Sequence, residues 1–240
     1  MGQSDRRSIG IVQHIRNFFK YKKHLYMAPL CFMLLAGGII LASVLLFDRF
    51  LNETHEPIQV NLDAPDYDFS GQTIVIDPGH GGKDPGATSI SGVTEDQIVF
   101  GIAKTLEARL ASSGAEVILT RDRDTFASLD ERKVEGDLFI SLHSDAMDDP
   151  SISGFTTYYT HPGQKAFAES INAALDQYSY FYNRGVETMN YQVTWQLDYP
   201  AVLVELGYLS NEVDDMSLTE TRYQNMMAAG ILEGIDDYLN

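Results

Sequence analysis

The sequence is poor in cysteine. Cys31 is the only cysteine among 240 residues, and it lies within a long apolar run. A single cysteine cannot form an intramolecular disulfide, so the rest of the chain must fold without one, even in an oxidising compartment. The small disulfide-stabilised class of extracellular domains is therefore excluded.

Basic residues are also scarce: 17 lysines and arginines stand against 34 acidic residues, giving a formal net charge of -17. Nearly all of the negative charge follows residue 47, because residues 1–26 carry six basic residues and one acid, Asp5. The six are Arg6, Arg7, Arg16, Lys20, Lys22 and Lys23. An acidic domain of this kind does not attract nucleic acid through its overall field, so we expect no nucleic-acid partner.

Charge is absent from residues 27–47, "MAPLCFMLLAGGIILASVLLF". A helix of this length spans a hydrocarbon core of about 30 Å, and the run lacks the polar stripe of a helix that packs on a soluble core. A cleaved signal peptide is the alternative, but its apolar region is usually only about 7–15 residues long, and the cleavage-site match here is weak. We therefore predict an uncleaved signal anchor.

The excess of basic residues before this run predicts a single-pass protein of the cell membrane, with its N-terminus in the cytoplasm. The predicted organisation is a basic cytoplasmic segment (1–26), a transmembrane anchor (27–47), a polar linker (48–71) and one folded domain (72–240) on the outer side.

Short apolar runs alternate with helical patterns after residue 72, which predicts an α/β domain with a mostly parallel or mixed sheet. The predicted strands lie within residues 73–77, 115–120, 137–143, 152–160, 185–193 and 200–207. The predicted helices lie within residues 95–114, 128–134, 163–178 and 218–239. The first helix shows apolar residues at a spacing of four and ends near a glycine, as helices commonly do. Asn211 reads as an N-terminal cap for the segment "EVDDMSL".

Several short motifs of catalysis are missing. The helical zinc signature HExxH is absent, as are the phosphate-binding patterns GxxxxGK[ST] and GxGxxG, and Pro85 removes a backbone donor from the glycine-rich loop. No GxSxG is present to support a serine hydrolase.

Three loops after strands carry side chains that suit a metal site. His80 follows "TIVID", His143 ends "DLFISLH", and Glu205 ends "AVLVE". In α/β folds such loops meet at one edge of the sheet. With Glu95, two imidazoles and a carboxylate would hold zinc and leave one position for water, while Glu205 would serve as acid/base.

Each of these residues also has a plainer interpretation. A histidine after a strand is often a turn residue, and Glu95 follows Thr94 at a helix start, where a carboxylate favours the helix dipole whatever its function. Asp77 and Asp84 are candidates for hydrogen bonds within their own loop. Glu205 is harder to explain away, because a carboxylate is costly to bury without a partner.

At these residues the sequence resembles the zinc-dependent N-acetylmuramoyl-L-alanine amidases, bacterial cell-wall enzymes. The resemblance covers about residues 73–238. It rests on four motifs in order: "IVIDPGHGGKDPGA", "TED" with "LTRDRDTFASLDER", "DLFISLHSDA" and "YPAVLVELGYLSN".

The resemblance implies that His80, Glu95 and His143 bind Zn²⁺ and that Glu205 is the catalytic acid/base. It also implies a sheet of about six strands flanked by helices, and hydrolysis of the amide between the lactyl group of N-acetylmuramic acid and L-alanine. The implied partner is peptidoglycan, on the cell-wall side of the membrane. A physiological role in cell separation, sporulation, germination or wall turnover is not distinguished, and no activator is identified.

Departures from the family pattern lie outside the expected ligands. "RKVEGD" at residues 132–137 is shorter than usual, which puts the helix expected there in doubt, and Asp145 stands where the family often has Asn. Arg184 and Asp145 are candidate substrate contacts. Two alternatives stay open: a non-catalytic peptidoglycan-binding scaffold on the same fold, and a zinc peptidase for other extracellular amides.

Overall fold

The computed structural model describes residues 13, 16–18, 20, 33–43 and 67–240. No helix within these ranges is long and apolar enough to cross a membrane. The predicted anchor falls only partly inside them: residues 33–43 are helical, and the rest of the 27–47 run lies outside the described residues. The anchor, most of the basic segment 1–26 and the greater part of the linker 48–71 therefore stay predictions.

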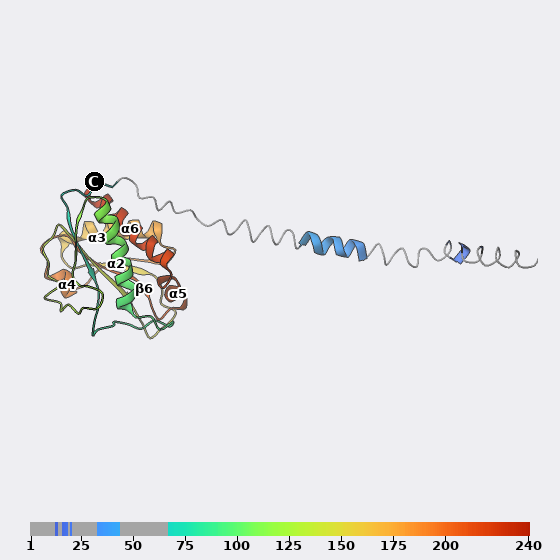
Figure 1. The fold of residues 1–240 in the computed structure, drawn as a ribbon, viewed down its shortest axis with the longest axis horizontal. Coiled ribbons are helices and arrows are strands. Elements are labelled where there is room, and N and C mark those ends of the chain that lie inside the picture. Colours follow the sequence, from blue (N-terminus) through green and yellow to red (C-terminus); the bar gives the residue numbers. More distant parts are fainter. Residues whose placement is uncertain (1–12, 14–15, 19, 21–32, 44–66) are drawn as a thin grey trace, which may run out of the picture. The chain divides into compact units, whose positions relative to one another are not determined.

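Residues 67–240 form an α/β domain around a six-stranded mixed sheet (Figure 1). The strand order is β2-β1-β3-β6-β4-β5. The strands are β1 (Thr73–Pro78), β2 (Glu116–Leu119), β3 (Leu138–Asp145), β4 (Phe155–Tyr159), β5 (Asn183–Thr188) and β6 (Ala201–Tyr208). Strands β2, β1, β3 and β6 are parallel, while β4 runs antiparallel to β6 and parallel to β5. The predicted fold class is confirmed for this domain.

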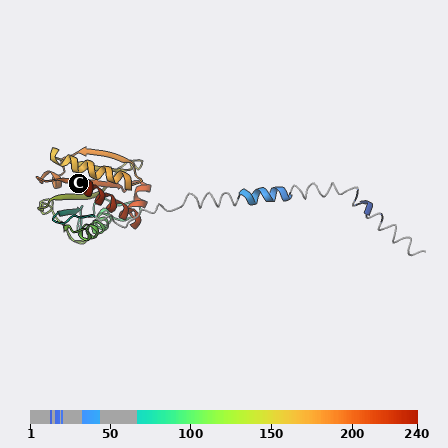
Figure 2. The ribbon, with the colours of Figure 1, turned by 90° about the horizontal axis from the view of Figure 1, so that it is seen from above.

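Three long helices cover one face of the sheet: α2 (Glu95–Ser112), α3 (Lys165–Tyr178) and α6 (Thr221–Leu239). Figure 2 shows α6 (red) between α2 (green) and α3 (orange), which both pack against it. The large core lies here, because every second residue of the strands turns a branched or aromatic side chain toward the helices. Phe69 belongs to this core, so ordered packing begins before residue 72.

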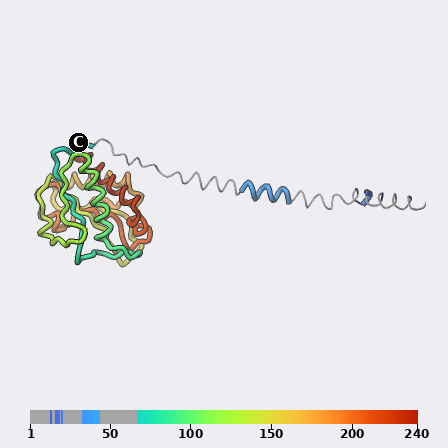
Figure 3. Tube along the Cα trace, viewed as in Figure 1, coloured from blue at the N-terminus to red at the C-terminus, as the bar shows by residue number. Residues whose placement is uncertain are grey.

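The other sheet face carries a smaller core and the short helix α4 (Gln192–Trp195). The 3-10 turn η1 (Pro162–Gln164) precedes α3, and α5 (Glu212–Leu218) precedes α6; Figure 3 traces the chain through these elements. Phe139 of β3 and Leu203 of β6 lie in the smaller core. On β3, Ser141 and His143 lie two and four residues after Phe139. On β6, Glu205 lies two residues after Leu203. Because side chains alternate along a strand, all three lie on the same face of the sheet.

The structure corrects one local prediction and confirms another. The helix expected at residues 128–134 is wrong: this segment forms only turns, with hydrogen bonds from Arg132 to Ser128 and from Lys133 to Asp130. No helix forms here because the Arg132 side chain is buried and hydrogen-bonded to another segment, and these bonds determine the path of the backbone. The cap at Asn211 is confirmed, since its side chain accepts hydrogen bonds from the backbone of Val213 and Asp214 at the start of α5.

Candidate metal centre

The glycine-rich loop after β1 brings His80 close to His143. A Cβ on Gly79 would lie only 2.4 Å from the His143 ring, and a Cβ on Gly86 would lie 2.5 Å from Glu95 and 2.7 Å from the His80 ring. Only glycine leaves room for this approach. His80 itself has φ +58°, and it is the single non-glycine residue with positive φ in the described part of the chain.

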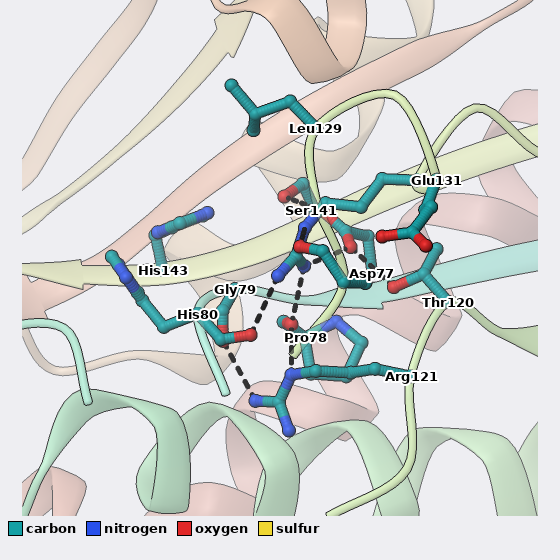
Figure 4. Close-up of polar contacts among 12 residues, drawn as sticks. Asp77, Pro78, Gly79, His80, Thr120, Arg121, Leu129, Glu131, Ser141 and His143 are labelled. Atoms are coloured by element: carbon teal, nitrogen blue, oxygen red, sulfur yellow. Dashed lines mark hydrogen bonds and ion pairs between the residues drawn. The ribbon is translucent and has the colours of Figure 1, made fainter. Parts of the chain in front are cut away.

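Three side chains from separate elements converge beyond the ends of β1 and β3. His80 follows β1, Glu95 is the first residue of α2, and His143 lies near the end of β3. His80 Nε2 is 3.0 Å from Glu95 Oε2, and His143 Nδ1 is 2.9 Å from Glu95 Oε1. The two imidazole rings lie edge to face with centroids 5.0 Å apart, and Figure 4 shows both on the same side of the loop.

The donor set fits zinc. Each of the three residues offers one ligand atom, and these atoms all lie within 4.8 Å of one another. Two imidazoles and a carboxylate are a common catalytic zinc set that leaves one position open. Each imidazole lies 2.9–3.0 Å from a different oxygen of Glu95, so the carboxylate is already in contact with both rings.

Asp84 contacts the ring nitrogen of His80 that faces away from Glu95. Its carboxylate lies 3.0 Å from His80 Nδ1 and accepts a hydrogen bond from the Gly86 backbone. A carboxylate at the second ring nitrogen fixes the tautomer and leaves Nε2 for a metal. Burial lowers the pKa of His80, but hydrogen bonds and charges from Glu95 and Asp84 outweigh it and raise the pKa to about 9.

Glu95 is more than a helix-start carboxylate. It is 4 % exposed, and it accepts hydrogen bonds from the backbone of Ala87 and Ser144 as well as contacting both histidines. Burial raises the pKa of Glu95, but hydrogen bonds with His143 and His80 outweigh it, so the pKa lies well below its usual value. The carboxylate is thus ionised and fixed between the two imidazoles.

Glu205 lies beside this group on the neighbouring strand. It pairs in register with His143 across β3 and β6, which places the two residues about 4.8 Å apart on one sheet face. Its Oε2 is buried and has no hydrogen-bond partner among the described residues. Burial raises the pKa of Glu205 well above its usual value, and the charges of Glu95 and Asp145 raise it further.

The two predicted substrate contacts lie near the same strand ends. Asp145 closes β3 and pairs with Tyr208 of β6, and its charge acts on Glu205. Arg184 is exposed on β5, where its guanidinium lies 5.3 Å from the centre of the Tyr208 ring and donates to the Ser153 carbonyl. Their role in substrate binding stays a prediction.

Comparison with known proteins identifies the family. Residues 74–237 match the Amidase_3 family, N-acetylmuramoyl-L-alanine amidase. The chain belongs to this family. It is 40% identical over 174 residues to the probable cell wall amidase LytH of Staphylococcus epidermidis, a match that covers 72% of this chain and 60% of that protein. The chain thus spans about three fifths of the length of this curated relative.

Solved amidase structures agree with the fold. The catalytic domain of CwlV, an N-acetylmuramoyl-L-alanine amidase from Bacillus (Paenibacillus) polymyxa var. colistinus, matches with TM-score 0.68 and 34% identity, over 70% of this chain and 98% of that one. The amidase AmiC2 of Nostoc punctiforme matches with TM-score 0.67 and 35% identity, over 71% and 98% of the two chains. The matched part of this amidase-family chain therefore corresponds to nearly all of each solved domain.

Sequence reasoning missed the groups that hold the histidine loop. The sequence predicts hydrogen bonds of Asp77 within its own loop, but Asp77 is fully buried and bonds to Thr120, Ser141 and Arg132. Arg121 is also buried, and no pattern around it in the sequence predicts this. The one available signal was an ionisable residue at the end of an apolar strand, because a buried carboxylate requires partners. The pattern does not say where in the chain those partners lie.

Proposed function

We propose that this protein is a zinc-dependent N-acetylmuramoyl-L-alanine amidase. It would hydrolyse the amide between the lactyl carbonyl of N-acetylmuramic acid and the L-alanine of the peptidoglycan stem peptide. One observation carries the proposal: Glu205, a buried carboxylate whose Oε2 has no hydrogen-bond partner in the described part of the chain, stands beside a cluster of two histidines and a glutamate. Family membership and the name of the LytH relative, probable cell wall amidase, support the same substrate.

His80, Glu95 and His143 would hold the zinc ion. Zinc so bound supplies a Lewis acid for the scissile carbonyl and lowers the pKa of water. Glu205 takes one proton from the attacking water and later gives it to the leaving nitrogen of L-alanine, so that water adds across the broken amide. Burial raises the pKa of Glu205 above its usual value, and a carboxyl group that holds a proton more readily is better suited to deliver it to the leaving nitrogen.

The proposed location is the outer face of the cell membrane, with residues 27–47 as the anchor. The support is the uncharged run and the six basic residues that precede it. Protease added to intact cell-wall-free cells should remove the domain and leave a short protected N-terminal fragment. A domain that is cut only after the cells are lysed contradicts this topology.

The direct test is product analysis with purified full-length protein and defined muropeptides. We expect mass spectrometry to show free stem peptide that begins with L-alanine. Release should stop with chelator, return with added zinc, and be lost in Glu205→Gln but kept in Glu116→Gln, which changes an exposed glutamate at the start of β2.

Each alternative gives a different result in the same assay. Muropeptide binding without any cleavage would indicate a scaffold. Cleavage at other peptide bonds, with the lactyl amide left intact, would indicate a zinc peptidase. Cleavage of the lactyl amide that persists in the presence of chelator and in Glu205→Gln would contradict the proposed mechanism.

A further inference from the structure

Two buried arginines donate hydrogen bonds to the backbone of the loop that carries His80. Arg121 donates to the carbonyls of Pro78 and Gly79, each at 2.8 Å. Arg132 donates to the carbonyls of Pro78 at 2.9 Å and His80 at 2.7 Å. Three consecutive carbonyls therefore accept hydrogen bonds from guanidinium groups. Figure 4 shows the Arg121 side chain reaching the loop from the opposite side to the His80 ring.

The same cluster reaches the strand that carries His143. Arg132 forms a buried ion pair with Asp77 at 2.6 Å. The other oxygen of Asp77 accepts a hydrogen bond at 2.7 Å from Ser141, two residues before His143 on β3. One network thus bonds directly to the His80 carbonyl and to the strand segment beside His143.

His80 needs such support. A left-handed backbone is unfavourable for a non-glycine residue, and such conformations persist when the surroundings fix them. The His80 carbonyl is bonded to Arg132, so the guanidinium holds the peptide plane that sets the direction of the imidazole. Lysine cannot reproduce this, because one ammonium lacks the planar fork that bonds several carbonyls at once.

We propose that Arg132, together with Arg121, is a positioning residue of the metal centre: it fixes the His80 turn so that both imidazoles are set for the metal before it binds. This inference rests on the zinc site of the proposed function. It assigns the arginines no contact with substrate and no part in proton transfer.

The test compares zinc affinity in full-length Arg132→Lys and Arg121→Lys. The matched control is Arg123→Lys, which changes an exposed arginine in the segment between β2 and β3 that also carries Arg121 and Arg132. Affinity is measured by competition with a chromophoric chelator, and the visible spectrum of the cobalt-loaded protein reports ligand geometry. We expect both buried-arginine variants to bind zinc about 10- to 100-fold more weakly with altered cobalt bands, and the control to match the wild type.

Ser141→Ala is a milder variant, needed because replacing a buried arginine can prevent folding. It removes one neutral hydroxyl from Asp77 and should lower zinc affinity several-fold while circular dichroism stays unchanged. Folded variants with wild-type zinc affinity and cobalt bands, and only a lower melting temperature, would overturn the positioning role alone. A wild-type protein that binds no zinc would instead overturn the proposed function on which this inference rests.

Discussion

At the scale of single residues, Glu205 is the proposed acid/base, and its burial lowers the stability of the fold. A carboxylate buried beside Glu95 and Asp145 costs folding free energy, whereas a neutral amide of the same shape does not carry that charge. The group that the proposed reaction needs is therefore one that the fold would be more stable without.

Glu205→Gln should reduce amidase activity by about 100- to 10,000-fold, the usual contribution of a general acid/base. Turnover of a defined muropeptide measures this loss. A variant that keeps more than a tenth of wild-type activity would contradict the assigned role.

The stability of the same variant should depend on pH. The pKa of Glu205 is raised in the folded state, so ionising this carboxyl group lowers the stability of the fold. The loss of stability is absent below the unfolded pKa of about 4.5, grows as the pH rises toward the folded pKa, and is constant above it. In chelated protein, Glu205→Gln should thus melt at a higher temperature than wild type at pH 8 and show no such advantage at pH 4. An equal difference at both pH values would argue against this.

Gly79 offers a steric test. Gly79→Ala would place a methyl group 2.4 Å from the His143 ring, so the histidine must move away from the shared ligand position. We expect at least a tenfold loss of zinc affinity and about 1–3 kcal/mol of stability. Gly163→Ala is the control, since a Cβ there meets nothing within 4 Å. Unchanged zinc affinity in Gly79→Ala would show that zinc binding does not depend on the present position of the His143 ring.

At the scale of elements, α5 begins at Asn211, whose side chain accepts hydrogen bonds from Val213 and Asp214 and donates one to the Pro150 carbonyl. Asn211→Ala should cost about 0.5–2 kcal/mol, the usual loss for an N-cap. Urea denaturation measures it, with Asn190→Ala, an exposed loop position, as control. An equal midpoint in the two variants would show that the cap contributes little.

Local pattern was sufficient to predict the elements that depend on local forces. The spacing of four in α2, the apolar run of β6 and the cap at Asn211 each depend on neighbours in sequence. The helix expected at 128–134 failed because Arg132 bonds to carbonyls some fifty residues away, and no local pattern records that partner. The antiparallel direction of β4 also depends on distant pairing.

The candidate site divides in the same way. His80, His143 and Glu205 could be proposed because each follows an apolar strand, where α/β folds place their chemistry. Asp77 and the two arginines could not, because buried ion pairs leave no periodic signal and their partners are set by tertiary contact.

At the scale of the whole molecule, the proposed ligands come from three distant segments and meet only in the folded domain. Zinc should then bind the native state far better than the unfolded chain and stabilise it by about 2.7 kcal/mol at one hundred times its dissociation constant. Calorimetry of the purified protein with and without chelator should show a lower melting temperature after metal removal. A melting temperature that does not respond to zinc would contradict a site of this kind.

The position of β6 has a consequence for biosynthesis. All three proposed ligands precede residue 144, but β6 is the last strand of the chain and lies between β3 and β4, both made earlier. Until it arrives, β3 has an open edge and the proposed acid/base is missing. A chain synthesised as far as residue 200 thus contains the three proposed metal ligands but not the proposed acid/base. Such a chain also lacks α6, which contributes Met227, Ile231 and Ile235 to the large core, so we expect the proposed activity to appear only after the last forty residues have joined the fold.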